Sequence, residues 1–461
     1  MRADIRQRLR ELGVVKGARG LETPSLSPLQ VGETRPRHRV AIENLVPGRF
    51  HTTSRGQCFV VEKNYSLDHL HGNLPLSAFL GVTPKIAAQV AQDGALAGVD
   101  LRRACFLDTE TTGLSGGTGT MAFVVGLGFF EETGFHLHQY FLRDPGDEPA
   151  MVETLVEQLL EFEALVSFNG IAFDVPVLEN RFILARTPPP TTRMPHLDLL
   201  PPARRLWRYH LPSRTLGTIE REILGVLREQ DDVPGGVIPW LYRDYLRTGD
   251  GREMKRVLYH NAVDILSLVT LAVRLCRTFA DPWDRANVSG AEFYGLGRWY
   301  AREERLTEAE RAYRAALDEA DLTPDLRTRT LRDLAHLLKR ANRRVEAFAY
   351  WQQLALEPTN DVDVDVNDVL AHVELAKYLE WHVKNLSLAA DWTRAAMARV
   401  EEWPEGERRY VTMTGLRHRL GRLERKMNLI PSAENRDSTR LKNRSGARDS
   451  EITSDNRRRR Q

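Results

Sequence analysis

The clearest chemical signal in the sequence is a pair of acids, Asp108 and Glu110, in the segment 106–114. Apolar residues precede the pair, which predicts a strand, and side chains two residues apart on a strand share one face. Two neighbouring carboxylates repel each other unless a cation lies between them. A bare D-x-E pair is common by chance, but this one ends a buried strand and precedes Thr-Thr-Gly-Leu. The segment therefore predicts a cation site.

Two later segments carry residues of the same kind. Segment 167–176 predicts a strand end and a turn at Asn169, followed by a helix whose first residues include Asp174. Segment 259–268 begins an apolar helix, on which His260 and Asp264 are four residues apart and share one face. Four acids and one imidazole thus come from three separate segments.

This set of side chains suits the hydrolysis of a phosphodiester bond. Carboxylate oxygens are the ligands that Mg²⁺ and Mn²⁺ prefer, and two such ions about 3.5–4 Å apart can stabilise both the attacking and the leaving oxygen. A histidine with a pKa near neutrality can act as a base. Alternatively, Asp108 and Glu110 are solvated strand-end charges, Asp174 a helix cap and His260 a packed surface imidazole. Their joint occurrence in this order favours function.

The three segments resemble the exonuclease motifs of the DEDD, or DnaQ-like, 3′-to-5′ exonucleases, which have a ribonuclease H-like fold. With the helical C-terminal part, the arrangement is similar to the bacterial YprB-like group. The resemblance implies two divalent cations, Mg²⁺ or Mn²⁺, on Asp108, Glu110, Asp174 and Asp264, and a water that His260 orients and deprotonates. It also implies that the terminal nucleotide contacts Thr111, Thr112, Gly113, Leu114, Asn169 and Phe173.

The histidine departs from the family pattern. The histidine subgroup usually carries it five residues before the last aspartate, and the tyrosine subgroup carries a tyrosine four before it. Here His260 is four residues before Asp264 and Tyr259 is five before it. A helical residue four positions away faces the same side as the aspartate, which favours His260 as the base and leaves Tyr259 as the alternative.

The leading hypothesis is a metal-dependent 3′-to-5′ exonuclease that acts on the 3′ end of single-stranded nucleic acid. One alternative is a non-catalytic scaffold that binds nucleic acid and protein. Another is an endonuclease of the same fold, which needs an open groove instead of a pocket for a chain end. DNA and RNA both remain open as substrates.

Residues 98–282 are predicted to form an α/β domain of the ribonuclease H-like class, with a mixed sheet flanked by helices. Runs 104–107, 121–130 and 135–142 indicate three strands; a helix starts near residue 147, and a short strand follows at 164–168. Residues 1–97 are interpreted as a partly irregular N-terminal extension of unknown role.

Residues 288–427 are rich in Ala, Leu, Arg and Glu with helical spacing. The pattern of 306–317 recurs at 386–397 and, degenerately, at 345–351, which predicts three tetratricopeptide-like units. Stacked units would leave a concave surface for a protein partner, whereas a plain helical bundle would only support the preceding domain. Residues 428–461 are predicted to be a disordered basic tail.

The composition and the apolar runs of the chain exclude several classes of protein. The chain has 461 residues and a net charge of +2, which argues against a wholly basic nucleic-acid-coating protein. The longest apolar run, 121–130, is too short to cross a membrane, and residues 1–13 lack the apolar stretch of a signal peptide. The three cysteines form no C-x-x-C pair. We expect a cytoplasmic protein without a zinc site.

Three further groups carry weaker signals. Asp198 could add an acid to the site, but a helix cap explains it better. Segment 68–72, with His69 and His71, is interpreted as a surface loop. Trp207, among arginines, is at least as easily a buried helix residue as a platform for single-stranded nucleic acid.

Overall fold

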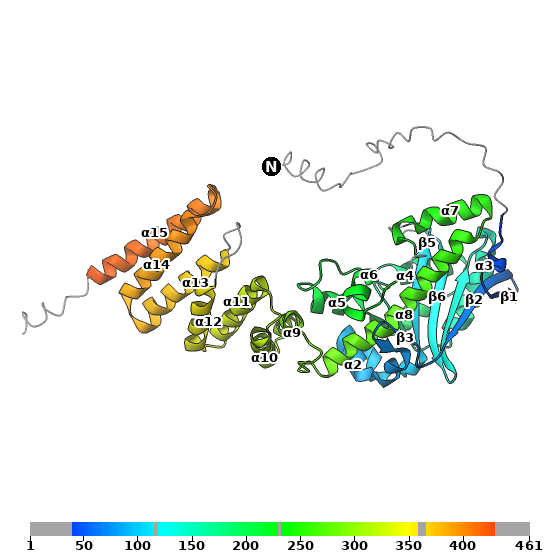
Figure 1. Cartoon of the computed structure of the whole chain (residues 1–461), viewed down its shortest axis with the longest axis horizontal. Coiled ribbons are helices and arrows are strands. Elements are labelled where there is room, and N and C mark those ends of the chain that lie inside the picture. Colours follow the sequence, from blue (N-terminus) through cyan, green and yellow to red (C-terminus); the bar gives the residue numbers. More distant parts are fainter. Residues whose placement is uncertain (1–38, 114–118, 229–231, 358–365, 429–461) are drawn as a thin grey trace, which may run out of the picture.

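The computed structural model describes residues 39–113, 119–228, 232–357 and 366–428. These residues form an α/β body and a row of helices that extends away from it (Figure 1). Leu114, the predicted tail beyond residue 428 and the first 38 residues lie outside the described part.

One mixed sheet of seven strands forms the centre of the body, in the order β1-β2-β7-β6-β5-β8-β9. The strands are β1 (Gly48–Thr53), β2 (Gly56–Tyr65), β5 (Ala104–Thr111), β6 (Ala122–Glu131), β7 (Gly134–Phe141), β8 (Ala164–Ser167) and β9 (His196–Asp198). Neighbours from β1 to β5 pair antiparallel, whereas β8 pairs in parallel with β5 and with β9. A separate hairpin contains β3 (Leu70–His71) and β4 (Leu74–Pro75). The predicted mixed sheet with flanking helices is confirmed.

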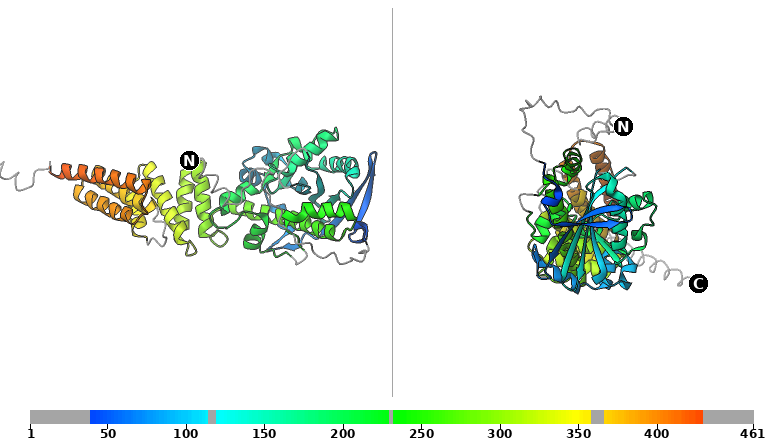
Figure 2. Two further views of the ribbon diagram at one scale, coloured as in Figure 1. Left: turned by 90° about the horizontal axis from the view of Figure 1, so that it is seen from above. Right: turned by 90° about the vertical axis from the view of Figure 1, so that its right-hand side faces the viewer.

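Helices cover both faces of this sheet (Figure 2). They are α2 (Pro84–Ala91), α3 (Glu148–Leu159), α4 (Asp174–Leu184), α5 (Leu200–Trp207), α6 (Leu216–Ile219), α7 (Ile238–Thr248) and α8 (Arg252–Ala280), and short 3-10 or π turns include η7 (Glu220–Leu224) and η8 (Gly235–Val237). Alternate residues of β5 enter two different cores: Phe106 packs with residues of α2, α5 and α8, and Leu107 with residues of α3, α4 and α7. The strand is therefore buried on both faces, which explains its nearly continuous apolar run.

Two glycines of β6 let α8 lie directly on the sheet. A Cβ atom on Gly126 would lie 2.4 Å from Oδ1 of Asn261, and one on Gly128 would lie 2.5 Å from Cγ2 of Ile265. Both contacts are shorter than real Cβ atoms tolerate. The small residues of β6 thus fix how closely the helix with His260 and Asp264 approaches the strand with Asp108 and Glu110.

The domain border predicted at residue 98 falls too late in the chain. Strand β2 pairs with β7, with Phe59 opposite Phe141 and Tyr65 opposite Phe135, and β1 adds the edge strand. Residues 58–61 of β2 are fully buried. This pairing joins segments about eighty residues apart, so the local pattern of the first hundred residues could not reveal it.

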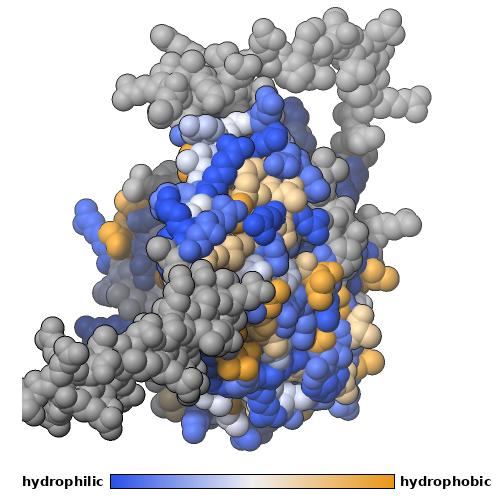
Figure 3. Space-filling model, turned by 90° about the vertical axis from the view of Figure 1, so that its left-hand side faces the viewer, coloured by the Kyte–Doolittle hydropathy of each residue, from blue (hydrophilic) through white to orange (hydrophobic). Residues whose placement is uncertain are grey.

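The row of helices contains three consecutive hairpins and a final helix. They are α9 (Gly290–Arg302), α10 (Leu306–Asp318), α11 (Pro324–Arg340), α12 (Arg344–Leu356), α13 (Val366–Tyr378), α14 (Leu386–Glu401) and α15 (Glu407–Asn428). Each helix contacts the next along the chain. Gly297 of α9 lies against Tyr313 of α10, where a Cβ atom would approach the ring to 2.5 Å. We call α9 to α15 the helical arm; its α15 end, seen end-on, is largely hydrophilic (Figure 3).

Helix α9 also packs on α5, so the arm begins inside the hydrophobic core of the body. Within the described ranges, no helix combines the length and the apolar character that a bilayer crossing needs.

Candidate active site

The C-terminal half of β5 carries the first two acids. Asp108 and Glu110 are partly exposed residues that alternate with the buried Thr109 and Thr111. The register between β5 and β6 shifts between Glu110 and Thr111, a bulge that ends the regular pairing beside the acids. The strand thus presents both carboxylates on one face, as the sequence pattern predicts.

The third acid, Asp174, is the first residue of α4. The turn before this helix uses a left-handed residue, Asn169 with φ 71°. Asp198 at the end of β9 holds that turn, because its carboxylate accepts hydrogen bonds from the backbone N–H of Asn169 (2.8 Å) and of Ile171 (3.2 Å). It also accepts from the N–H of Leu200, the first residue of α5 (3.0 Å). The N-cap of α5 is Leu199, so Asp198 bonds the start of this helix from one residue before the cap position. Thr109 donates to Oδ1 of Asp174 at 2.5 Å, which links this acid to β5.

Helix α8 brings the histidine and the last acid to the same place. Nε2 of His260 lies 3.9 Å from Oε1 of Glu110 and 3.5 Å from Oδ2 of Asp264. These three residues each offer one ligand atom within 4.8 Å of the others. Tyr259 packs against the apolar core of the body instead. Of the two candidate bases, His260 is therefore the one that faces the acids.

Burial makes this cluster electrostatically costly. It raises the pKa of Asp108 and Glu110 well above their usual values, and repulsion from the other acids raises it further. Burial raises the pKa of Asp174 to about 6, although its hydrogen bond from Thr109 acts in the opposite direction. The pKa of Asp264 is also raised by burial, against the effects of His260 and Arg228.

The donor set fits hard divalent cations. Four carboxylates that are buried or partly buried and close enough to repel one another are stable as anions only when positive charge compensates them. Their oxygens, with one imidazole nitrogen, match the preference of Mg²⁺ and Mn²⁺, and no cysteine lies among them. The side chains that could hold such ions are Asp108, Glu110, Asp174 and Asp264.

Four residues that support the site were not predicted from the sequence. Nδ2 of Asn261 donates to Oδ2 of Asp108 at 2.8 Å, and Oδ1 of Asn261 accepts from Gln139 of β7 at 2.8 Å. Beyond α6, Arg228 and Asp232 contact His260, Arg228 also contacts Asp264, and Glu220 pairs with Arg228. Asn261 directly follows His260 in the sequence, and this position could have suggested a role for it. The stretch 220–232 reads as a solvated charged run and gives no such signal.

The residues expected to contact a nucleotide lie around the same end of the sheet. Oγ1 of Thr111 donates to the carbonyl of Gly113 (2.7 Å), and Oγ1 of Thr112 accepts from the N–H of Met121 (3.0 Å). Both hydroxyls thus bond backbone atoms of residues 113 and 121, on either side of the stretch 114–118. Asn169 is exposed and Phe173 half-buried.

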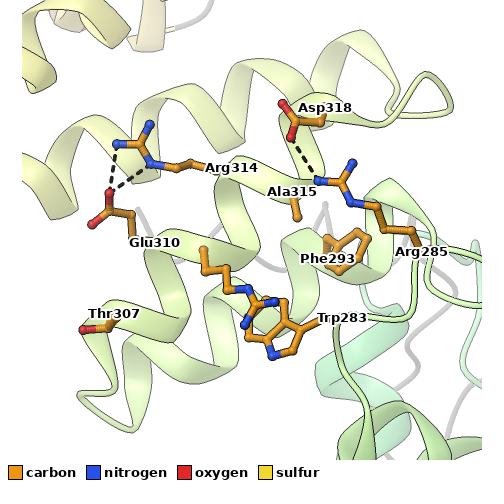
Figure 4. A pocket seen from close by; sticks show the side chains of 9 residues that line it. Trp283, Arg285, Phe293, Thr307, Glu310, Arg314, Ala315 and Asp318 are labelled. Atoms are coloured by element: carbon orange, nitrogen blue, oxygen red, sulfur yellow. Dashed lines mark hydrogen bonds and ion pairs between the residues drawn. The ribbon is translucent and has the colours of Figure 1, made fainter.

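A cleft of about 500 Å³ passes His260 and Asp264 and is lined on its other side by Thr215, Thr218, Leu227 and Pro234. Leu227 is 82% exposed there. A second hollow, of about 430 Å³, lies on the arm between Trp283, Phe293 and Arg311 (Figure 4). None of the predicted site residues lines this hollow, whereas His260 and Asp264 line the first cleft.

Two weaker sequence candidates can now be assigned. Trp207 is fully buried and donates from Nε1 to Glu292 at 2.7 Å, which confirms the reading of a buried helix residue. The prediction of a surface loop at 68–72 is wrong for His71, which is 8% exposed and bonds Ser267 of α8 at 2.8 Å. The β3–β4 hairpin turns this side chain inward, against α8.

Comparison with known proteins agrees with this geometry. Residues 105–276 match RNase_H_2, a family of the RNase_H superfamily. The uncharacterized protein YprB of Bacillus subtilis (strain 168) is 30% identical over 334 residues, which cover 72% of this chain and 78% of that protein.

Proposed function

Because the chain belongs to the family of Bacillus subtilis YprB and contains an RNase H-like domain, which suggests a nuclease, we propose a metal-dependent 3′-to-5′ exonuclease. Its substrate would be single-stranded nucleic acid, and the bond cleaved a phosphodiester. The observation that carries the proposal is the convergence of Asp108, Glu110, Asp174, His260 and Asp264 from β5, α4 and α8.

The four carboxylates would hold two divalent cations, Mg²⁺ or Mn²⁺. When bound, these ions supply charge stabilisation for the attacking and leaving oxygens of the phosphodiester. The protein contributes a rigid set of ligands: Asn261 orients Asp108, and Thr109 orients Asp174. Preorganised ligands need little rearrangement when the substrate arrives.

His260 would take the proton of the attacking water. Its Nε2 faces the carboxylates, and the ring is 14% exposed at the edge of the cleft, so water can reach it. A neutral imidazole nitrogen can accept a proton from a water beside it.

The family resemblance assigns the terminal nucleotide to segment 111–114 with Asn169 and Phe173. Exposed Asn169 and half-buried Phe173 flank the turn before Asp174, which supports this assignment. The arm, in turn, would bind a protein partner on its stacked tetratricopeptide-like hairpins, as their chain-order packing suggests.

The test uses purified full-length protein with 5′-labelled single-stranded DNA and RNA, in Mg²⁺, Mn²⁺ or chelator. We expect products that shorten from the 3′ end, only with metal. Asp108→Asn with Glu110→Gln should abolish them, whereas Asp244→Asn, an exposed acid on α7, should not. Cleavage of a circular single strand would favour the endonuclease, and binding without any cleavage would favour the scaffold.

A further inference from the structure

The side chains of His260 and Asp264 each carry two polar atoms. In each side chain, one of these atoms contacts a residue outside the acid cluster. Nδ1 of His260 lies 2.7 Å from Oδ1 of Asp232, while Nε2 faces Glu110. Oδ1 of Asp264 accepts from Arg228, while Oδ2 faces Nε2 of His260 at 3.5 Å. In both groups, one atom is held by these partners and the other is turned toward the cluster.

Arg228 is itself fixed by a buried carboxylate. Glu220, 1% exposed, accepts from Nε (2.6 Å) and Nη2 (2.7 Å) of Arg228 in a two-point contact. Ser267 of α8 donates to the same carboxylate at 2.6 Å. Two parallel bonds define the plane of a guanidinium, so Arg228 cannot turn away from Asp264 without leaving Glu220 unpaired.

The positions of its partners indicate which nitrogen of a neutral His260 ring carries the hydrogen. Nδ1 lies near both the Asp232 carboxylate at 2.7 Å and Nη1 of Arg228 at 2.9 Å. One ring nitrogen cannot donate to the first and accept from the second. A guanidinium N–H can only donate, and the Asp232 oxygen is the closer partner, so Nδ1–H donates to Asp232, and Nη1 of Arg228 donates to Oδ2 of Asp232 at 3.4 Å instead. The lone pair then resides on Nε2, the atom that faces the acids.

We propose that Asp232 and Arg228, anchored on Glu220, are positioning residues that hold His260 in the Nδ1–H form and turn one oxygen of Asp264 toward the cluster. The kinetic consequence rests on the proposed nuclease function, whereas the form of the ring does not. Partners of this kind fix the orientation and tautomer of a histidine and typically change activity about 10–100-fold when removed.

The ring is tested first in the metal-free, full-length protein, by ¹⁵N NMR of labelled histidine side chains, with His260→Gln to assign the signal. We expect the Nδ1–H form in the wild type. Asp232→Ala should shift the ring toward a mixture of both forms, and Asp232→Glu, which keeps a carboxylate, should restore the Nδ1–H form. An Asp232→Ala spectrum identical to that of the wild type would overturn the proposal.

Kinetics on a single-stranded oligonucleotide form the second arm. Asp232→Ala should lower kcat about 10–100-fold with KM within about twofold, because the residue acts through His260 and not on substrate binding. Asp244→Ala on α7, an acid 59% exposed and paired with Arg247, is the matched control and should leave kcat unchanged. An equal effect of both variants, or a change in KM alone, would contradict a positioning role.

Arg228→Lys tests whether the two-point contact with Glu220 is needed or the positive charge alone suffices. Lysine keeps the positive charge but cannot make the two-point contact with Glu220 and still reach Asp264. We expect kcat to fall by about tenfold or more while the far-ultraviolet circular dichroism stays that of the wild type. Full activity of this variant would show that the two-point contact of Arg228 with Glu220 does not position Asp264. If the wild type hydrolyses no nucleic acid, the proposed function fails, and the NMR experiment alone still decides the form of the ring.

Discussion

At the scale of single residues, the four acids of the candidate site would stabilise bound cations, and their burial and mutual repulsion destabilise the protein without such cations. Burial and mutual repulsion act on Asp108 in the same direction, since both favour its neutral form. Replacing one of these acids by its amide removes repulsion and keeps the shape. Asn261 can still donate to the amide oxygen at position 108.

We therefore predict opposite effects of Asp108→Asn with and without metal. Without metal, the variant should melt about 2–4 °C higher than the wild type, as expected for about 1 kcal/mol of relieved repulsion. With Mn²⁺, the wild type should gain thermal stability by mass action, and the variant should gain much less. Differential scanning calorimetry with and without Mn²⁺ measures both shifts. A variant that melts lower in chelator and gains as much from Mn²⁺ as the wild type would argue against the cation site.

A second residue, His71, should make the fold sensitive to acid. Its Nε2–H donates to Ser267, whose hydroxyl donates to Glu220, and burial lowers its pKa from 6.5 to about 4. Glu220 opposes this shift, while Arg228 and His69 add to it. The folded state thus binds this proton less readily than the unfolded chain. The contribution of neutral His71 to the free energy of unfolding is therefore fully present above pH 6.5 and is lost as the pH falls toward 4.

The prediction concerns His71→Gln, which can donate one hydrogen bond but does not titrate. Between pH 7 and pH 5 the wild type should lose about 2 kcal/mol more unfolding free energy than the variant. Urea titrations at the two pH values provide the comparison, which cancels the contribution of the acids. Parallel losses in both proteins would show that His71 is protonated without cost.

The residues that sequence could predict are those whose partner is set by local geometry. Asp108 and Glu110 share a face because they are two apart on a strand, and His260 and Asp264 because they are four apart on a helix. Glu220, Arg228 and Asp232 gain their role only when α8 meets the segment after α6. That meeting depends on tertiary packing, which no spacing rule describes.

At the scale of elements, the contact of α8 with β6 sets the geometry of the site. Asn261 is fully buried and joins Gln139 of β7 to Asp108 of β5, and it occupies the space that a side chain at position 126 would need. The lack of a side chain at Gly126 thus leaves the room that Asn261 needs beside the candidate site.

Gly126→Ala should consequently lower stability and activity together. We expect a loss of about 1–3 kcal/mol, typical of overpacking in a core, and weaker metal binding because Asn261 must move from Asp108. Gly415→Ala in α15, where a Cβ atom meets open space, is the control and should leave stability unchanged or slightly higher. Urea unfolding with Mn²⁺ titrations tests both. An unchanged Mn²⁺ affinity of the Gly126 variant would show that the packing of α8 on β6 does not affect metal binding.

The strands illustrate which elements a sequence reveals. Runs 104–107, 121–130, 135–142 and 164–168 correspond to β5 to β8 because central, buried strands are apolar and bounded by turns. Strand β9 has only three residues, and the sequence around it was interpreted as a helix entry. β1 and β2 belong to the sheet through long-range pairing with β7, which local patterns do not contain.

At the scale of the whole molecule, a buried acid adds polar contacts to the apolar packing between the arm and the body. Glu292 of α9, 4% exposed, accepts from Nε1 of Trp207 (2.7 Å) and from Nη2 of Arg274 (2.6 Å). Nearby, a Cβ atom on Gly295 would lie 2.5 Å from the carbonyl oxygen of Leu206, so α9 touches the backbone of the body. The border predicted between residues 282 and 288 is therefore a change of fold class and not a break in the core.

Glu292→Ala should for this reason weaken the body as well as the arm. It leaves the buried indole of Trp207 without its acceptor and removes the ion pair of Arg274, which keeps only Thr278 and the carbonyl of Asn287 as acceptors. We expect a cost of about 3 kcal/mol. Glu308→Ala on α10, an acid paired with Arg305 at the surface, is the control and should change stability little. Hydrogen exchange followed by mass spectrometry reports each helix separately. Because α5 and α9 share one core, protection should fall in both helices of the Glu292 variant; a loss confined to the arm would instead show that the two parts unfold independently.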